Sequence, residues 1–121
     1  MSVPHRILLV DDEPDSLFVL SSILNSNGYV INTISDPLEL SIAINKFLPQ
    51  LIILDIRMGE YDGRELCREL RKQTRYDAVK VILYSAFPEI REDYVLCGAQ
   101  AFILKPAEAT HILAEIKKLL D

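Results

Sequence analysis

Five short apolar segments alternate with segments of helical spacing along the whole chain. The apolar segments span residues 7–10, 29–34, 51–54, 79–84 and 101–104. Their length and their content of β-branched residues are typical of buried strands. Parallel strands need long crossover connections, and right-handed crossovers place helices on both faces of the sheet. The alternation therefore predicts an α/β fold with a doubly wound, five-stranded parallel sheet.

The connecting segments carry signals for helix starts and ends. Pro14 suits the first position of a helix that ends near Gly28. Asp36 is an N-cap acid before Pro37 and Glu39, which predicts the start of a second helix. Apolar stripes indicate three more helices, marked by Leu66 and Leu70, by residues 89–97, and by Ile112, Leu113, Ile116 and Leu120.

Length and composition limit the class of protein. With 121 residues, half of them hydrophobic, residues 1–121 are expected to form one domain with a proper core. A net charge of -5 argues against direct binding of nucleic acid, which requires clustered Lys and Arg. No apolar run approaches the roughly 18 residues of a membrane span, and the start "MSVPHR" is unlike a signal peptide, so a cytoplasmic location without membrane contact is expected.

The cysteines show no known metal or redox spacing. Cys67 and Cys97 form no CxxC motif and have no nearby histidine. They are predicted to be reduced, partly buried thiols.

Polar residues follow each of the five predicted strands. In a parallel α/β sheet, ligands bind outside the carboxyl ends of the strands. Asp36, after the second strand, is better explained as a helix cap. The remaining candidates are Asp11 and Asp12 after the first strand, Asp55 after the third, Ser85 after the fourth and Lys105 after the fifth.

Three carboxylates at neighbouring strand ends would repel one another unless a cation lay among them. Mg²⁺ prefers oxygen ligands and keeps positions open for a phosphate oxygen. Lys105 adds a second cation, and Ser85 adds a hydroxyl donor. Taken singly, each residue has an ordinary explanation, as a helix cap, a turn residue or a surface charge. Their joint placement at one sheet edge instead predicts a site that receives a phosphoryl group.

Four sequence motifs resemble those of the receiver domains of two-component response regulators. They are "LLVDDEP", "LIILDIRMGEYDG", "VILYSA" and "GAQAFILKP", in this order over essentially the whole chain. The resemblance implies a single receiver domain over residues 1–121 with a flavodoxin-like (βα)5 fold and strand order 2-1-3-4-5. It also implies a role in bacterial-type phosphorelay signalling.

The resemblance assigns the phosphoacceptor and the metal ligands. Asp55 would accept the phosphoryl group from the phosphohistidine of a histidine kinase or phosphotransfer protein. Asp11, Asp12 and Asp55 would bind Mg²⁺ or Mn²⁺, together with the backbone carbonyl of Arg57. The protein would thus be no enzyme in the usual sense and would assist only its own phosphorylation and dephosphorylation.

The resemblance also assigns the residues that sense the phosphoryl group. Ser85 would donate a hydrogen bond to one phosphoryl oxygen, and Lys105 would pair with another. Phe102 would be the switch aromatic that turns inward when Ser85 is drawn to the phosphate. The Lys105–Pro106 bond would be cis, which makes Pro106 a cis-proline.

Several alternatives stay open at this point. The chain could be a stand-alone receiver that signals to a downstream protein, or a piece of a longer protein with an output domain. A degenerate receiver that only binds proteins is disfavoured, because every acid, the hydroxyl and the lysine are present. An aspartyl phosphatase is disfavoured because Asp11 is followed by Asp12, Glu13 and Pro14 rather than by a second aspartate two residues on. A nucleotide-binding module is disfavoured because the chain lacks glycine-rich phosphate loops.

Some positions depart from the family pattern. Gly59 stands where proline is usual, which predicts a looser loop, and Tyr61 replaces an aliphatic residue. Arg57 and Phe87 border the site at positions that tend to tune the lifetime of the phosphoryl group.

The residues of a common dimer interface are also altered. DNA-binding members of the family dimerise through the fourth helix, fifth strand and fifth helix, where acidic residues pair with an arginine. The corresponding positions here are Gln100, Ala101 and Glu115. A symmetric dimer of this kind is therefore not expected.

Overall fold

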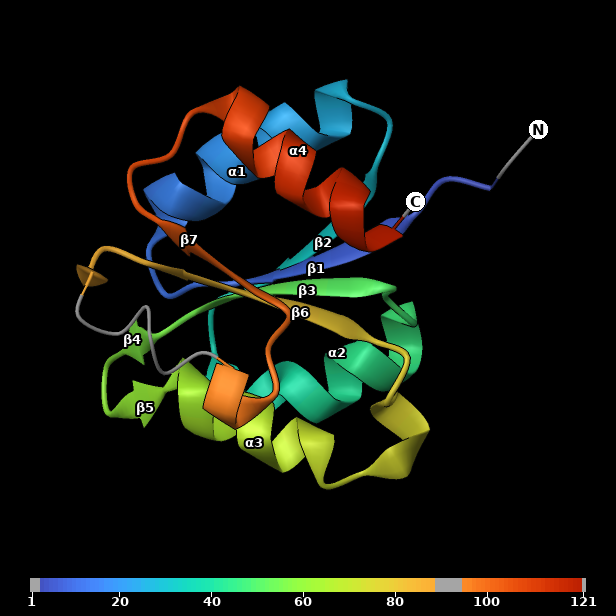
Figure 1. The fold of residues 1–121 in the computed structure, drawn as a ribbon, viewed down its shortest axis with the longest axis vertical. Helices are drawn as coiled ribbons and strands as arrows, with labels where there is room; N and C mark the ends of the chain where they lie inside the picture. Colours follow the sequence, from blue (N-terminus) through green and yellow to red (C-terminus); the bar gives the residue numbers. More distant parts are fainter. Residues whose placement is uncertain (1–2, 89–94, 121) are drawn as a thin grey trace.

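The computed structural model describes residues 3–88 and 95–120. A central parallel sheet of five strands runs through the molecule (Figure 1). Its order β2-β1-β3-β6-β7 is the expected 2-1-3-4-5 when only the strands of this sheet are counted. The strands are β1 (Arg6–Val10), β2 (Val30–Ile34), β3 (Leu51–Asp55), β6 (Lys80–Ser85) and β7 (Ala101–Leu104). The predicted doubly wound fold is confirmed.

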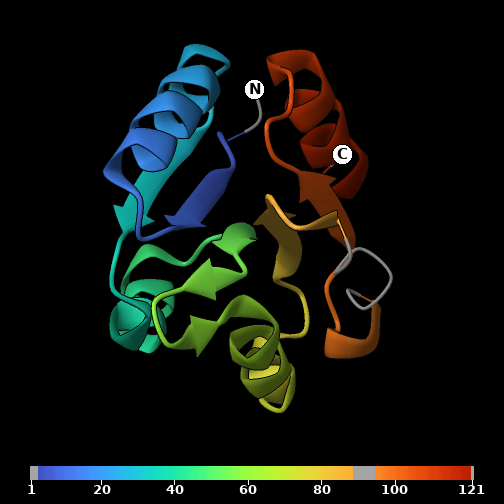
Figure 2. The same ribbon diagram turned by 90° about the vertical axis from the view of Figure 1, so that its left-hand side faces the viewer.

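Helices cover both faces of the sheet (Figures 1 and 2). One face carries α1 (Pro14–Ser26) and α4 (Ala109–Leu120). The other face carries α2 (Leu40–Phe47) and α3 (Gly63–Arg71). Two short 3-10 helices, η1 (Pro37–Glu39) and η2 (Thr74–Tyr76), accompany α2 and α3.

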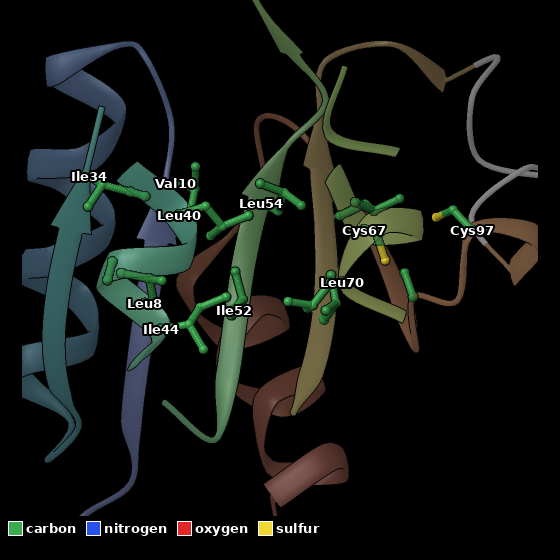
Figure 3. Close-up of a cluster of buried hydrophobic side chains, with 14 of the residues drawn as sticks. Leu8, Val10, Ile34, Leu40, Ile44, Ile52, Leu54, Cys67, Leu70 and Cys97 are labelled. Carbon is green, nitrogen blue, oxygen red and sulfur yellow. The ribbon is translucent and has the colours of Figure 1, made fainter. Parts of the chain in front are cut away.

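Alternate side chains of each strand enter two separate cores. On β1, Ile7 and Leu9 pack with Leu20 and Leu24 of α1. Leu8 and Val10 face the other side and join a cluster with residues of α2 and α3, part of which is shown in Figure 3. Because both faces of the strands are buried, the strands read as continuous apolar runs in the sequence.

The helix-start signals were correct, with one difference in the first turn of the second helix. Pro14 is the first residue of α1, and Gly28 follows its end with a φ of 89°. The Asp36 side chain accepts a hydrogen bond from the backbone N–H of Leu38 at 3.0 Å, as expected of a cap. The first turn after Asp36 is the 3-10 helix η1 rather than part of an α-helix. Of the helix predicted over residues 89–97, residues 89–94 lie outside the described residues, and residues 95–97 form a 3-10 turn.

A two-stranded hairpin follows β3 and was not predicted. Its strands are β4 (Arg57–Met58) and β5 (Tyr61–Asp62), and Gly59 between them has a φ of 61°. The loop therefore has a defined fold, while its mobility stays a prediction. Within residues 3–88 and 95–120, no helix is both long and apolar enough to span a membrane.

Candidate functional site

The register of the sheet brings the predicted site residues to one edge. Val10 lies beside Leu54, so Asp11 and Asp55 follow neighbouring strands at the same level. Asp55 pairs in turn with Tyr84, which places Ser85 one residue further along β6. Ser85 pairs with Leu104, so Lys105 follows directly. The parallel register thus gathers residues that are up to 94 positions apart in the chain.

A cluster of three carboxylates lies at this edge. One oxygen each of Asp11, Asp12 and Asp55 lie within 4.8 Å of one another. Asp11 is buried, Asp12 is exposed and Asp55 is intermediate. Oxygen ligands at this spacing suit a small, hard divalent cation that keeps part of its water shell. The residues present therefore fit Mg²⁺, as the sequence predicted.

Lys105 reaches into the carboxylate cluster. Its Nζ lies 2.8 Å from Asp11 Oδ2 and 3.7 Å from Asp55 Oδ2. The remaining oxygens also have partners: Asp11 Oδ1 accepts from the N–H of Glu13 at 2.9 Å, and Asp55 Oδ1 accepts from that of Ile56 at 2.8 Å. The peptide bond between Lys105 and Pro106 is cis.

The environment shifts the pKa values of Asp55 and Lys105. Burial raises the pKa of Asp55 to about 6, and the charge of Asp11 adds to this rise, whereas Lys105 opposes it. Burial alone would lower the pKa of Lys105. Its hydrogen bond to Asp11 and the negative charges of Asp55 and Asp11 outweigh burial, so the pKa of Lys105 is raised. Lys105 is thus held in its charged form beside Asp55.

Ser85 lies fully buried at the end of β6. Its Oγ accepts a hydrogen bond from the N–H of Phe87 at 3.1 Å. The hydroxyl proton can still be donated to another group. Phe102 is partly buried on β7, beside Leu83 and against the core on the side of α2 and α3. Ser85 and Phe102 thus belong to adjacent strands of the sheet.

An open cavity of about 330 Å³ leads to the carboxylates. Arg57 and Phe87 stand at its margin, where the guanidinium carbon lies 4.1 Å from the centre of the Phe87 ring. This is a cation-π contact between the two positions expected to border the site. The cavity is lined by Asp12, Glu13, Ser16, Asp55, Arg57, Ala86, Phe87, Lys105 and Pro106.

Gly63 allows α3 to begin directly beside the end of β3. A Cβ at this position would lie 2.1 Å from the backbone oxygen of Asp55, so no side chain fits. The N–H of Gly63 donates to the carbonyl oxygen of Ile56 at 2.7 Å. This contact joins the start of α3 to the residue between β3 and the β4–β5 hairpin.

Tyr84 is a site neighbour that sequence reasoning missed. Lys105 Nζ lies 4.9 Å from the centre of its ring. Burial raises the pKa of the Tyr84 hydroxyl. Because side chains alternate along a strand, Tyr84 faces the core of α1 and α4 when Ser85 faces the opposite side. The sequence feature that could have identified Tyr84 is its position directly before Ser85. An aromatic residue within an apolar run is, however, typical of the core.

Known proteins resemble this chain in sequence and in fold. Residues 7–117 match the family model of the response regulator receiver domain. The probable transcriptional regulator ycf27 of Porphyra purpurea is 33% identical over 118 residues, covering 96% of this chain and 47% of that protein. The phosphate regulon transcriptional regulatory protein PhoB of Rhizobium meliloti is 30% identical, covering 95% of this chain and 52% of that protein. The chain thus spans about half the length of these curated relatives.

A solved structure of similar length also resembles this chain in sequence and in fold. The response regulator protein TrrA of Thermotoga maritima, in complex with Mg²⁺-BeF, is 34% identical with a TM-score of 0.86. The match covers 96% of this chain and 99% of that chain. In this neighbour the same fold holds a magnesium ion together with a beryllium fluoride group.

Proposed function

This chain belongs to the response regulator receiver domain family, and we propose that it accepts a phosphoryl group on Asp55 and passes the signal to a protein partner or output domain. The main support is the position of Asp55, whose carboxylate lies 3.7 Å from Lys105 Nζ and within 4.8 Å of the acidic pair at the open edge of the sheet. The donor would be the phosphohistidine of a histidine kinase or phosphotransfer protein. The chain would assist only its own phosphorylation and dephosphorylation.

In the proposed transfer, an Asp55 oxygen forms a bond to phosphorus while the bond from phosphorus to the donor's imidazole nitrogen breaks. The imidazole leaves and takes up a proton. This reaction needs in-line placement and charge neutralisation more than acid or base assistance. Lys105 is charged and its Nζ lies 3.7 Å from Asp55 Oδ2, so it can pair with the oxygens of the transferred phosphoryl group. Arg57 and Phe87 at the cavity margin would limit the approach of water to the acyl phosphate.

Asp11, Asp12 and Asp55, with the backbone carbonyl of Arg57, would hold Mg²⁺ or Mn²⁺. The bound ion would neutralise charge on the phosphoryl oxygens. The chain's own contribution is to hold the three carboxylates together: Asp11 is fixed by Lys105 and by the N–H of Glu13. Asp12 is exposed and open to a ligand from solvent.

Ser85 and Phe102 would convert phosphorylation into a change of surface. The Ser85 hydroxyl would donate to a phosphoryl oxygen and draw the end of β6 toward Asp55. Phe102, on the neighbouring strand, would move toward the space that this shift leaves. The acyl phosphate adds charge and acceptor oxygens at one point. The movement of Ser85 and Phe102 would then alter the surface to which a protein partner binds.

Labelling with a small phosphodonor tests the proposal. Incubation with acetyl phosphate and Mg²⁺ is expected to add one phosphate that hydroxylamine removes, and Asp55→Asn should abolish the labelling. Asp36→Asn is a matched control, because Asp36 is an exposed cap after β2 at the same sheet edge and should label like wild type. A chain that only binds proteins would take up no phosphate. Equal labelling of the Asp55→Asn variant would place the acceptor elsewhere.

Mg²⁺ is expected to stabilise the folded chain by mass action. At a concentration tenfold above the dissociation constant, the gain in unfolding free energy is about 1.4 kcal/mol. Asp12→Ala should remove most of this gain, and the variant should equal or exceed wild type in stability without metal, because one repelling charge is gone. Thermal unfolding with and without Mg²⁺ measures both effects. A wild-type melting temperature that does not change when millimolar Mg²⁺ is added would contradict the proposed metal site.

Phosphorylation is expected to change a surface for a different protein rather than to drive a symmetric dimer. Gln100 points its Oε1 to the N–H of Val81 at 2.7 Å, and Glu115 pairs with Lys118 on its own helix. Neither supplies the complementary charges that set the register of such dimers. Light scattering with beryllofluoride and Mg²⁺ should show a monomer. A shift to a dimer, together with loss of that dimer when Gln100 and Glu115 are substituted, would refute this expectation.

A further inference from the structure

Two cysteines far apart in the sequence meet in the core on the side of α2 and α3. Cys67 lies on α3 and is fully buried; Cys97 lies in the 3-10 turn of residues 95–97 and is 2% exposed. Figure 3 shows both side chains at the same end of the buried cluster to which they belong. The two thiols are within hydrogen-bonding reach of each other. The sequence predicted reduced, partly buried thiols; in the structure both cysteines are free, but both are almost entirely buried and lie in the same cluster.

The neighbouring residue Arg71 fixes α3 against the same turn. Arg71 follows Cys67 by one helical turn, so both face the turn of residues 95–98. The Arg71 Nε donates to the carbonyl oxygen of Gly98 at 2.9 Å, and a Cβ at Gly98 would lie 2.6 Å from Arg71 Cγ. Gly98 also has a φ of 92°, which favours glycine. The close approach of the cysteines is therefore part of a specific contact between α3 and this turn.

Other hydrogen bonds hold Arg71 in place. Its guanidinium donates to the carbonyl oxygens of Tyr76 at 3.1 Å and Val79 at 2.7 Å, and to Gln100 Oε1 at 3.1 Å. These partners lie on the segment before β6 and on the segment before β7. Arg71 thus ties α3 to both segments and limits how far the two sulfurs can separate.

The surroundings make the two thiols unequal. The hydrogen bond from Cys67 lowers the pKa of Cys97 to about 6 against the opposing effect of burial, with help from the N–H of Ala99 and the charge of Arg68. The same hydrogen bond, together with burial, raises the pKa of Cys67. A thiolate is the reactive form in oxidation and disulfide exchange. Cys97, which lies in a turn with the exposed residues Val95 and Leu96, is thus suited to react first, and Cys67, buried on α3, to resolve the product.

We propose that Cys67 and Cys97 form a redox-active pair that a peroxide converts into an intramolecular disulfide. The Cys97 thiolate attacks one oxygen of hydrogen peroxide, the O–O bond breaks, and the released hydroxide takes up a proton to give water. The resulting sulfenic acid at Cys97 is attacked by the sulfur of Cys67. The S–S bond forms as the S–O bond breaks, and the second water leaves with the proton of Cys67. The two sulfurs are oxidised and the peroxide is reduced.

The route to the buried sulfurs would lie through the turn itself. Its other two residues, Val95 and Leu96, are exposed by 64% and 78%, so the turn that carries Cys97 lies at the surface although Cys97 itself is buried. A local opening of the turn would expose Cys97 to a molecule as small as peroxide without unfolding the sheet. The disulfide would then fix this turn to α3. Because the turn leads into β7, which carries Phe102 and is followed by Lys105, oxidation would act on the segment next to the proposed switch.

Oxidation of the purified full chain tests the proposal independently of phosphorylation. Treatment with hydrogen peroxide and a metal chelator should consume both thiols and leave a monomer, and a non-reducing digest should yield one peptide pair that joins Cys67 to Cys97. A thiol reductant should restore both thiols. In Cys67→Ala, Cys97 should stop at the sulfenic acid, which dimedone traps, and in Cys97→Ala the remaining thiol should react far more slowly.

Three outcomes would overturn the proposal that Cys67 and Cys97 form a redox-active pair. The first is a wild-type chain that keeps both thiols under conditions that oxidise Cys97 in Cys67→Ala. The second is independent oxidation of each cysteine to a sulfinic acid without a cross-link. The third is a disulfide between two chains. Circular dichroism of both alanine variants checks that they are folded, because each substitution removes a buried side chain.

Discussion

Replacing Lys105 with methionine is expected to destabilise the metal-free protein by roughly 3 kcal/mol at neutral pH. The lysine is only 18% exposed and is the cation between Asp11 and Asp55, at 2.8 Å and 3.7 Å. Its removal leaves two close carboxylates without a counter-charge, while methionine preserves most of the packing of the side chain. Urea unfolding in the presence of a chelator measures the difference.

The loss of stability caused by Lys105→Met should become smaller as the pH falls. As the pH falls through about 6 toward 4, Asp55 becomes protonated and its repulsion with Asp11 disappears, so the variant should approach wild type. Lys118→Met is the matched control, because Lys118 is 70% exposed and pairs with Glu115 at the surface. It should change stability by less than about 0.5 kcal/mol. Equal losses for the two variants would show that Lys105 is an ordinary surface charge.

Replacing Asp55 with asparagine is expected to stabilise the metal-free protein above pH 6. Burial raises the pKa of Asp55 from its ordinary value of 3.8 to about 6, so the folded state binds a proton more tightly than the unfolded chain. Ionisation of Asp55 therefore lowers stability as the pH rises from about 4 through 6. Asparagine avoids this charge. Allowing for partial solvent contact, the gain at neutral pH should be on the order of 2 kcal/mol, at about 1.4 kcal/mol per pKa unit.

The gain from Asp55→Asn should vanish below about pH 4, where Asp55 is neutral in both states. Asp62→Asn provides a control of opposite sign. Hydrogen bonds from Arg64 lower the pKa of Asp62, so its charge stabilises the fold above its ordinary pKa and this contribution is lost as the pH falls. Unfolding curves at acid and neutral pH compare both variants. A constant difference for Asp55→Asn at all pH values would contradict the raised pKa.

The predicted fold and site residues came from features that are local in sequence. Each buried strand is one apolar run, and each site residue directly follows such a run. Because the ends of parallel strands meet at one edge, the grouping of Asp11, Asp55 and Lys105 could be inferred without knowing any distance. The helix starts marked by Pro14 and Asp36 are likewise set by neighbouring residues.

The features that escaped prediction depend on contacts between distant segments. The β4–β5 hairpin requires Gly63 to approach the backbone of Asp55, and the sequence shows only a glycine. Tyr84 contacts Lys105 because of strand alternation and sheet register together. Cys67 and Cys97 meet because Arg71 holds α3 against the turn before β7, a contact with no signal in the spacing of the cysteines.

Chemical trapping of the acyl phosphate tests the central claim most directly. The chain is phosphorylated with acetyl phosphate and Mg²⁺, reduced with borohydride, which converts a phosphorylated aspartate into homoserine, and then digested and sequenced by mass spectrometry. We predict homoserine at position 55 and intact aspartates at Asp11, Asp12 and Asp62. Homoserine at any other position, with Asp55 unchanged, would contradict the assignment of Asp55 as the phosphoacceptor.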